Sequence, residues 1–185
     1  MKILTYTDCH FSQYSSIVRS RSNKFSVRLE NIIKSVNWAE SLAIEQQADI
    51  IVINGDFFDK ADLNAEEITA FEEIKWAHVP HYVLVGNHEM GINDLSYSSA
   101  HLLKSIPMCT LITTPCYIHE SMNSQKRLLF LPYMLESNRK DFSYYAKHAS
   151  PIYSDDIYPY EKTIVFTAVH YVIELQRTEK PSPHH

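Results

Sequence analysis

Glycine is scarce in this sequence. The chain has 3 glycines among 185 residues, where average usage gives about 13. A chain this poor in glycine should keep it where no other residue fits, such as a tight turn or a close backbone approach. Gly55 and Gly86 lie in polar clusters directly after apolar runs, and the third glycine is Gly91. The search for function therefore starts at these polar clusters.

Other features that are rare or missing exclude several classes of protein. The 3 cysteines, Cys9, Cys109 and Cys116, form no CxxC pair, which suits a reduced, cytoplasmic compartment better than a disulfide framework. No apolar run approaches the roughly 18 residues that span a bilayer and no signal-peptide pattern opens the chain, so we expect no membrane partner. A net charge of -5 argues against nucleic-acid binding through bulk positive charge.

The length and composition predict one globular domain. With 45% hydrophobic and 21% charged residues, the chain is ordinary globular material and not a disordered or fibrous one. We expect the domain over residues 1–175 and a flexible tail over 176–185, where the sequence is polar and carries proline.

Strands and helices alternate in the first half of the chain. The β-prone runs are Lys2–Thr7, Asp49–Asn54 and His81–Val85, and the middle one reads as a strand buried on both faces. Apolar residues at three- and four-residue steps predict a helix over 28–47. Asn64 and Glu67 resemble a capping box that opens a second helix. The apolar face of that helix is formed by Ile68, Phe71, Ile74 and Ala77.

This βαβαβ order predicts an α/β fold with a parallel sheet. In such sheets the loops after the carboxyl ends of the strands meet at one edge, where ligands bind. The second half is less regular. It carries strand-like runs at 108–113, 115–120, 127–132 and 163–169 and a helical segment near 136–148.

Each of the first three strands ends in a cluster of potential metal ligands, namely Asp8–Cys9–His10, Gly55–Asp56–Phe57–Phe58–Asp59 and Gly86–Asn87–His88–Glu89. Asp8 and His10 lie two apart in an extended segment, so their side chains should point to the same side. Asp56 ends a buried strand, where a lone carboxylate is costly unless a cation compensates its charge. Asn87 offers an amide oxygen, whereas His88 next to it should project elsewhere.

Taken singly, each cluster has an ordinary explanation. An Asp-x-His pair is common, and Asp or Asn after a strand is usually a turn residue or a helix N-cap. A single histidine is more often a surface or core residue than a catalyst. The coincidence favours function, because three strands in order are each followed by a ligand-rich cluster, with glycine at two of them.

The three clusters resemble the first three motifs of the calcineurin-like metallophosphoesterases, Asp-x-His, Gly-Asp-x-x-Asp and Gly-Asn-His-Glu, over about residues 1–170. The GDFFD form of the second motif and the later Leu131-Pro132-Tyr133 are most similar to DNA-repair nucleases, the SbcD-type exonuclease and phage recombination endonuclease subunits. The resemblance implies a four-layer α/β/β/α sandwich, C-terminally truncated. It also implies DNA as substrate, an SbcC-type coiled-coil ATPase and often a second copy of the chain as partners, and the cytoplasm of a bacterial or phage-infected cell.

The same resemblance implies the metal ligands. Asp8 and His10 would bind the first of two divalent ions, Asp56 would bridge both, and Asn87 would bind the second. The fourth motif is a histidine at the end of a later strand, for which His170 is the best candidate, its alternative being an ordinary strand-end histidine. Because the donors are oxygen and nitrogen, Mn²⁺ is favoured, with Mg²⁺, Zn²⁺ or Fe²⁺ as alternatives.

Three further residues have catalytic or supporting roles by resemblance. His88 would contact the scissile phosphate and protonate the leaving oxygen, held in orientation by Glu89. Asp59 would accept a hydrogen bond from a ligand histidine. Cys9 lies between two ligands and should point away from them, into the protein.

The sequence departs from the family at its fifth motif, Gly-His-x-His. No glycine occurs after Gly91, and His184 and His185 are adjacent rather than alternating. The chain is therefore expected to be either a truncated form or one with an incomplete site and weaker metal binding.

The segment between Ser12 and Arg28 bears on the substrate. It carries Arg19, Arg21, Lys24 and Arg28 and no acid. These residues could steer a polyanionic backbone toward the metals, or they could form an ordinary solvated loop.

Three functions remain open on this evidence. The first is a two-metal phosphodiesterase that cuts DNA, in which a metal-bound hydroxide attacks phosphorus. The second is a small-molecule phosphodiesterase or phosphatase of the same superfamily. The third is an inactive, truncated module that binds DNA or a partner without cutting.

Overall fold

Two four-stranded β-sheets make up the centre of the computed structural model, which describes residues 1–14, 24–120, 126–153 and 162–168. The first sheet has the order β1-β2-β3-β4 and is parallel throughout. Its strands are β1 (Ile3–Tyr6), β2 (Ile50–Asn54), β3 (His81–Leu84) and β4 (Cys109–Ile112). The three strands and the parallel pairing predicted for the first half are thus confirmed.

Helices connect the strands of the first sheet. Helix α1 (Val27–Glu45) lies between β1 and β2, α2 (Ala65–Phe71) between β2 and β3, and the 3-10 helix η1 (Ser99–Ser105) between β3 and β4. Helix α2 begins with the predicted capping box of Asn64 and Glu67. It ends at Phe71, earlier than the apolar face suggested, and the chain continues in tight turns in which the N–H groups of Glu73 and Ile74 donate to the carbonyl oxygens three residues before them. Ala77 is nevertheless buried in the same core.

The second sheet has the order β7-β5-β6-β8. Its strands are β5 (Cys116–His119), β6 (Lys126–Leu131), β7 (Ser150–Pro151) and β8 (Lys162–Thr167). Only the β5–β6 pair is antiparallel, and β7 and β8 pair in parallel with β5 and β6. The predicted helix near 136–148 is divided into the 3-10 helix η2 (Glu136–Asn138) and helix α3 (Phe142–His148), because Arg139 between them is extended.

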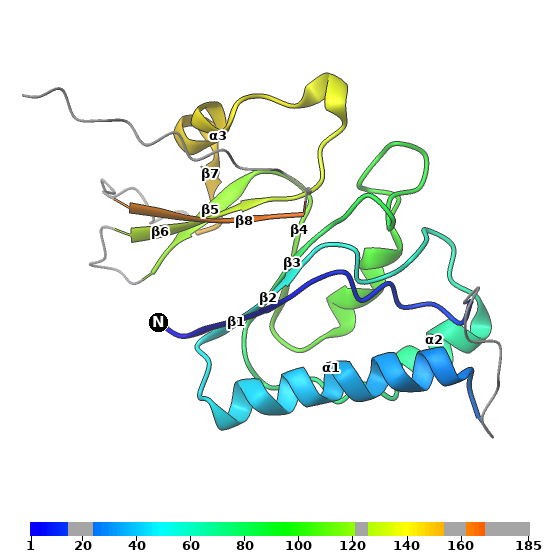
Figure 1. Cartoon of the computed structure of the whole chain (residues 1–185). Helices are drawn as coiled ribbons and strands as arrows, with labels where there is room; N and C mark the ends of the chain where they lie inside the picture. The colour runs from blue at the N-terminus through cyan, green and yellow to red at the C-terminus, as the bar shows by residue number, and fades with distance from the viewer. Residues whose placement is uncertain (15–23, 121–125, 154–161, 169–185) are drawn as a thin grey trace, which may run out of the picture.

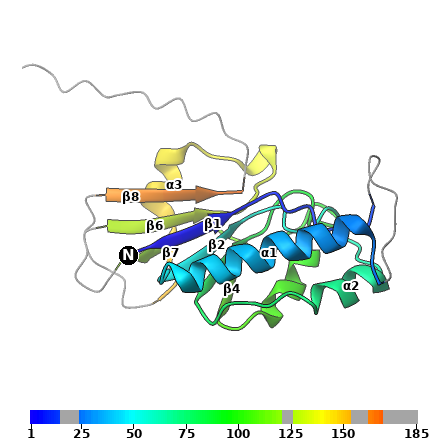
Figure 2. The ribbon, with the colours of Figure 1, turned by 60° about the horizontal axis from the view of Figure 1, so that its bottom comes forward.

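Three buried apolar clusters separate four layers. Residues of α1 and α2 pack on one face of the first sheet, where Figure 2 shows α1 running along the strands. The second cluster lies between the sheets and includes the stacked rings of Tyr82 and Phe130, 5.1 Å apart. The third joins the second sheet to α3 through Leu129 and Tyr145. This α/β/β/α order, visible in Figure 1, confirms the expected fold.

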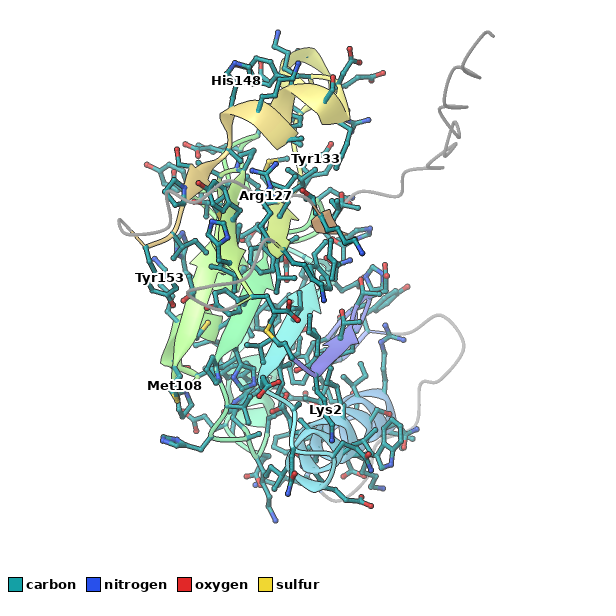
Figure 3. All side chains as sticks on the ribbon, turned by 90° about the vertical axis from the view of Figure 1, so that its left-hand side faces the viewer. Lys2, Met108, Arg127, Tyr133, His148 and Tyr153 are labelled. Atoms are coloured by element: carbon teal, nitrogen blue, oxygen red, sulfur yellow. The ribbon has the colours of Figure 1, made fainter. Side chains whose placement is uncertain are left out.

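The layer under α3 also holds a buried cation. Arg127 of β6 is 2% exposed, donates to Thr163 Oγ1 at 3.1 Å and to the Ala146 carbonyl oxygen of α3, and lies over the Tyr117 ring. Figure 3 shows it beneath the helix that carries His148, away from the ends of β1–β3. Arg127 therefore belongs to the scaffold of the outer layer.

The carboxyl ends of β1, β2 and β3 lie side by side, because the strands are neighbours and parallel. The segments that follow them are the three clusters singled out from the sequence. In the part of the chain that the structure describes, no helix is both long and apolar enough to cross a bilayer.

Candidate metal centre

Backbone hydrogen bonds join the segment after β1 to the segment after β2. The N–H groups of Asp8, His10 and Phe11 donate to the carbonyl oxygens of residues 55, 56 and 57, at 3.3, 3.0 and 2.7 Å. Phe11 is fully buried against the Phe57 and Phe58 rings. The first two clusters are therefore held together as one unit by their backbones and by an aromatic core beneath them.

The segment after β1 is not extended as the sequence suggested. Strand β1 ends at Tyr6, and Asp8 and His10 have left-handed backbones, with φ of 52° and 45°. The expected reason for their convergence, alternation along a strand, is therefore wrong. They approach each other through two left-handed residues, which places His10 Nε2 3.7 Å from Asp8 Oδ1.

Asp56 also has a left-handed backbone, with φ of 49°. Non-glycine residues in this region are uncommon and cost free energy, and they gather at functional sites. The Asp56 side chain accepts a hydrogen bond from the backbone N–H of His88 at 3.1 Å, and the residue is only 3% exposed. A carboxylate this buried needs compensation by donors or by a cation.

Three side chains from the three clusters come together in one group. One ligand atom each of His10, Asp56 and His88 can be chosen so that all lie within 4.8 Å of one another. The two imidazole rings are 4.7 Å apart and nearly perpendicular. His88, which the sequence predicted to project elsewhere than its neighbour Asn87, has its ring in this group. The turn that aims its N–H at Asp56 also brings its ring to the group.

Asp59 contacts both histidines. Its Oδ1 lies 3.2 Å from His10 Nδ1, and its backbone carbonyl oxygen lies 3.3 Å from His88 Nδ1. Metal-binding histidines commonly have such a partner at the nitrogen that does not face the metal. The contact with His88 is a hydrogen bond, whereas the approach to His10 is close in distance but not aligned as a hydrogen bond. Asp59 therefore lies beside both imidazoles.

Glu89 is fully buried and its carboxylate faces the backbone. It accepts hydrogen bonds from the N–H of Gly86 at 2.7 Å and of Phe58 at 3.1 Å. Burial raises its pKa to about 7, and the nearby Asp56 carboxylate adds to the rise. Glu89 thus links the second and third clusters through these two hydrogen bonds. The Nδ1 atom of the His88 ring makes its two contacts with Asp59 instead. The orientation of His88 by Glu89 remains a prediction.

The other predicted ligands are placed only in part. Asp8 lies outside the three-residue group, and its Oδ2 accepts from Thr7 Oγ1 at 2.8 Å. Asn87 is exposed, and its carbonyl oxygen accepts from the N–H of Met90 at 3.4 Å. The remaining predicted residues, Arg19, Arg21 and His170, lie outside the described residues, as do the adjacent His184 and His185.

The two described basic residues of the expected DNA-steering segment make contacts within the protein. Lys24 is exposed and pairs with Glu73, in the turn after α2. Arg28 is partly buried and donates from its guanidinium to the carbonyl oxygen of His10 at 3.0 Å. Neither residue therefore needs a substrate to account for its position.

The donor set fits a divalent metal ion. The grouped atoms are imidazole nitrogens and a carboxylate oxygen, which suit ions such as Mn²⁺, Fe²⁺ or Zn²⁺. Cys9 takes no part, since burial raises the pKa of its thiol to about 12 and the residue packs against the core. A thiol that stays protonated is a poor metal ligand.

The donors lie at the carboxyl edge of a parallel sheet in a four-layer α/β/β/α sandwich. This combination of fold and site is typical of metal-dependent hydrolases. The chain belongs to the calcineurin-like phosphoesterases, because that family's model matches residues 1–174. The family consists of hydrolases that act on phosphoester bonds. The expectation from the three motifs is thus confirmed at the level of the family.

A curated relative is the DNA double-strand break repair protein Mre11 of Methanosarcina mazei. It is 32% identical over 95 residues, which is 48% of this chain and 14% of the relative. The match therefore spans a small part of that protein's length.

Proposed function

We propose that this chain is a metal-dependent phosphodiesterase that acts on DNA. The observation that carries the proposal is the meeting of His10, Asp56 and His88 within 4.8 Å. These residues come from the three motifs of a phosphoesterase family. The match to a DNA double-strand break repair protein supports DNA as the substrate class.

The proposed metal site uses two divalent ions, with Mn²⁺ as the first candidate. Asp8 and His10 would hold one ion, Asp56 would bridge, and Asn87 would hold the second, with His170 as a further ligand. When bound, the ions would clamp the phosphate and lower the pKa of a water molecule, which makes it a nucleophile. Because His88 belongs to the same group as His10 and Asp56, it could also be a ligand. Titration calorimetry of His88→Ala with Mn²⁺ decides between the roles, since the affinity should fall for a ligand and stay unchanged for a proton donor.

His88 is the proposed proton donor. Its Nδ1 lies 3.3 Å from the carbonyl oxygen of Asp59. A carbonyl oxygen can only accept, so this contact keeps a hydrogen on Nδ1. Nε2 is then the nitrogen that, in the imidazolium form, gives its proton to the leaving oxygen. Asp59 supports this role by fixing the ring.

We also propose a wider role in a repair or recombination complex, for which the match to a DNA double-strand break repair protein is the support. We propose an SbcC-type coiled-coil ATPase and a second copy of this chain as partners, inside a bacterial or phage-infected cell. Of the four cations proposed to steer DNA, Lys24 pairs with Glu73 and Arg28 donates to the His10 carbonyl oxygen, so these two add less support to the DNA proposal. The DNA proposal therefore depends on the relative more than on charge.

Hydrolysis assays with three substrates test the proposal. The purified chain is incubated with Mn²⁺ and single-stranded DNA, bis-p-nitrophenyl phosphate or p-nitrophenyl phosphate. We expect cleavage of DNA that EDTA abolishes and that Asp56→Asn reduces by at least about 100-fold. Asp62→Asn, at an exposed position six residues after Asp56, removes the same charge and should leave the rate unchanged. Cleavage of the two small substrates without DNA would favour the small-molecule enzyme.

The position of Asp8 outside the three-residue group favours one further candidate, an inactive module that binds DNA or a partner. It predicts no hydrolysis of any of the three substrates across a Mn²⁺ titration. It also predicts that Asp56→Asn leaves DNA affinity unchanged in a filter-binding or fluorescence-anisotropy assay.

A further inference from the structure

Arg28 is enclosed by the protein near the proposed metal site. It lies in the first turn of α1, and its guanidinium donates to the carbonyl oxygen of His10 at 3.0 Å. Its Nε is buried and has no hydrogen-bond partner among the described residues. A cation that reached for a polyanionic substrate would keep its head in solvent. Arg28 instead directs its head at the backbone of a proposed ligand.

The His10 peptide groups are fixed from two directions. The N–H of His10 donates to the carbonyl oxygen of Asp56 at 3.0 Å, and its own carbonyl oxygen accepts from Arg28. Between these bonds the residue has a φ of 45°, a conformation that persists only when the surroundings hold it. This conformation brings the His10 ring within 4.7 Å of the His88 ring. The direction of the imidazole thus depends on both bonds.

The start of α1 gives Arg28 a fixed platform. The Ser26 side chain caps the helix by accepting from Leu29 N–H at 3.3 Å, and the Ser26 N–H donates to Glu66 Oε1 at 2.9 Å. Leu29 is fully buried. The guanidinium is planar and presents several donors in a rigid arrangement. An arginine side chain therefore loses less conformational entropy than a lysine side chain when it donates to a carbonyl oxygen.

We propose that Arg28 is a positioning residue that holds His10 in the left-handed conformation required for metal binding. It acts on the metal site through the His10 backbone, and it does not bind the substrate. The inference rests on the proposed function for the identity of the site. Its test is therefore read on the metal and on the His10 backbone, without substrate.

Three variants separate the two roles of Arg28. Arg28→Gln removes the charge and most donors, Arg28→Lys keeps the charge and a donor, and Lys34→Gln removes an exposed cation from the same helix as a control. Mn²⁺ affinity is measured by titration calorimetry or electron paramagnetic resonance. We expect Arg28→Gln to weaken binding by about 10–100-fold, Arg28→Lys to recover part of it, and Lys34→Gln to match the unmodified chain. DNA affinity in EDTA should fall no more for Arg28→Gln than for Lys34→Gln.

Unchanged Mn²⁺ affinity together with a larger loss of DNA affinity for Arg28→Gln would overturn the proposal and restore Arg28 as a substrate contact. A second readout uses the metal-free protein, where the carbonyl ¹³C shift of His10 should move in Arg28→Gln and stay in Lys34→Gln. If the unmodified chain binds no Mn²⁺, the proposed function fails, and this shift still decides the role of Arg28. If Arg28→Gln does not fold, Arg28→Met, which keeps an apolar side chain and removes every donor, takes its place in both measurements, and an unmoved His10 shift in that variant contradicts the inference.

Discussion

A Cβ atom built on Gly86 would lie 2.1 Å from Oδ1 of Asp56, far closer than two such atoms can approach. The loop after β3 therefore passes directly over the carboxylate that ends β2. The same loop donates the N–H of His88 to that oxygen at 3.1 Å. Gly55 is required next to it for a different reason, because its φ is 88° and such a backbone favours glycine. Two of the three glycines are thus used to let the proposed ligands meet.

Gly86→Ala should damage the metal site more than the fold. The added methyl group would also meet the backbone nitrogen of Asp56 at 2.4 Å, so the carboxylate and the loop have to separate. We expect a loss of about 2 kcal/mol in unfolding free energy and at least about a tenfold loss of Mn²⁺ affinity. Urea denaturation and titration calorimetry measure these. Gly91→Ala is the control, because its methyl group would meet only Tyr97. Equal Mn²⁺ affinity in both variants would contradict the expectation.

Asp59→Asn tests the support of the histidines. The substitution removes the charge 3.2 Å from His10 Nδ1 but leaves the backbone carbonyl that contacts His88. We expect Mn²⁺ affinity to fall about tenfold, with little change in unfolding free energy because the side chain is partly exposed. Calorimetric titration with Mn²⁺ checks this, and Asp62→Asn serves as the matched exposed control. An affinity equal to that of the control would show that Asp59 gives His10 no support.

Local patterns were sufficient to predict the first three strands of the first sheet. Each of these is followed by a helix or helical turn, so the parallel order follows from short right-handed connections. The run at 108–113 was predicted as a strand, but not that it joins this sheet as β4. The second sheet could be predicted only as a set of strands. The parallel pairing of β6 with β8 joins segments about 36 residues apart, as with Arg127 and Thr163, and no local pattern encodes that choice. The break between η2 and α3 could not be predicted from a local pattern either. It is accompanied by a hydrogen bond from the Lys140 N–H to the Tyr145 hydroxyl.

The candidate site was predictable in its parts and not in its geometry. The edge rule for parallel sheets brings Asp56 and His10 together from the sequence alone. The inclusion of His88 depends on a turn whose N–H donates to Asp56, and the contact of Arg28 with the His10 carbonyl oxygen joins residues that are 18 apart in the sequence. Side-chain alternation holds only in extended segments. It therefore misplaced residues in loops that are bent by tertiary hydrogen bonds.

Glu67→Gln should destabilise the connection between the segment after β1 and α2. The buried carboxylate accepts from the N–H groups of Asn64 and Gln13, both at 3.0 Å, and pairs with Lys60. Burial alone would raise the pKa of Glu67, but these partners outweigh it and lower the pKa. Its stabilisation is thus present above about pH 4.5 and lost as the pH falls through the folded-state pKa. At pH 7 we expect a loss of about 2 kcal/mol in urea denaturation, against none for the exposed Glu72→Gln.

Glu89 should give the metal-free protein a pH dependence of the opposite sign. Burial raises the folded-state pKa of Glu89 to about 7, and the Asp56 carboxylate adds to this rise. The hydrogen bonds from the N–H groups of Gly86 and Phe58 lower the pKa, but they do not cancel the rise. The unfolded chain releases this proton near pH 4.5. Between these values the folded state holds the extra proton, so stability falls as the pH rises and levels off above about pH 7. The fall contributed by Glu89 is about 3 kcal/mol. Urea denaturation in EDTA from pH 5 to pH 8 measures how far the unfolding free energy falls with pH. In Glu89→Gln this fall should be smaller by the contribution of Glu89. Parallel pH profiles for the two proteins would show that Glu89 is charged throughout this range, in spite of its burial.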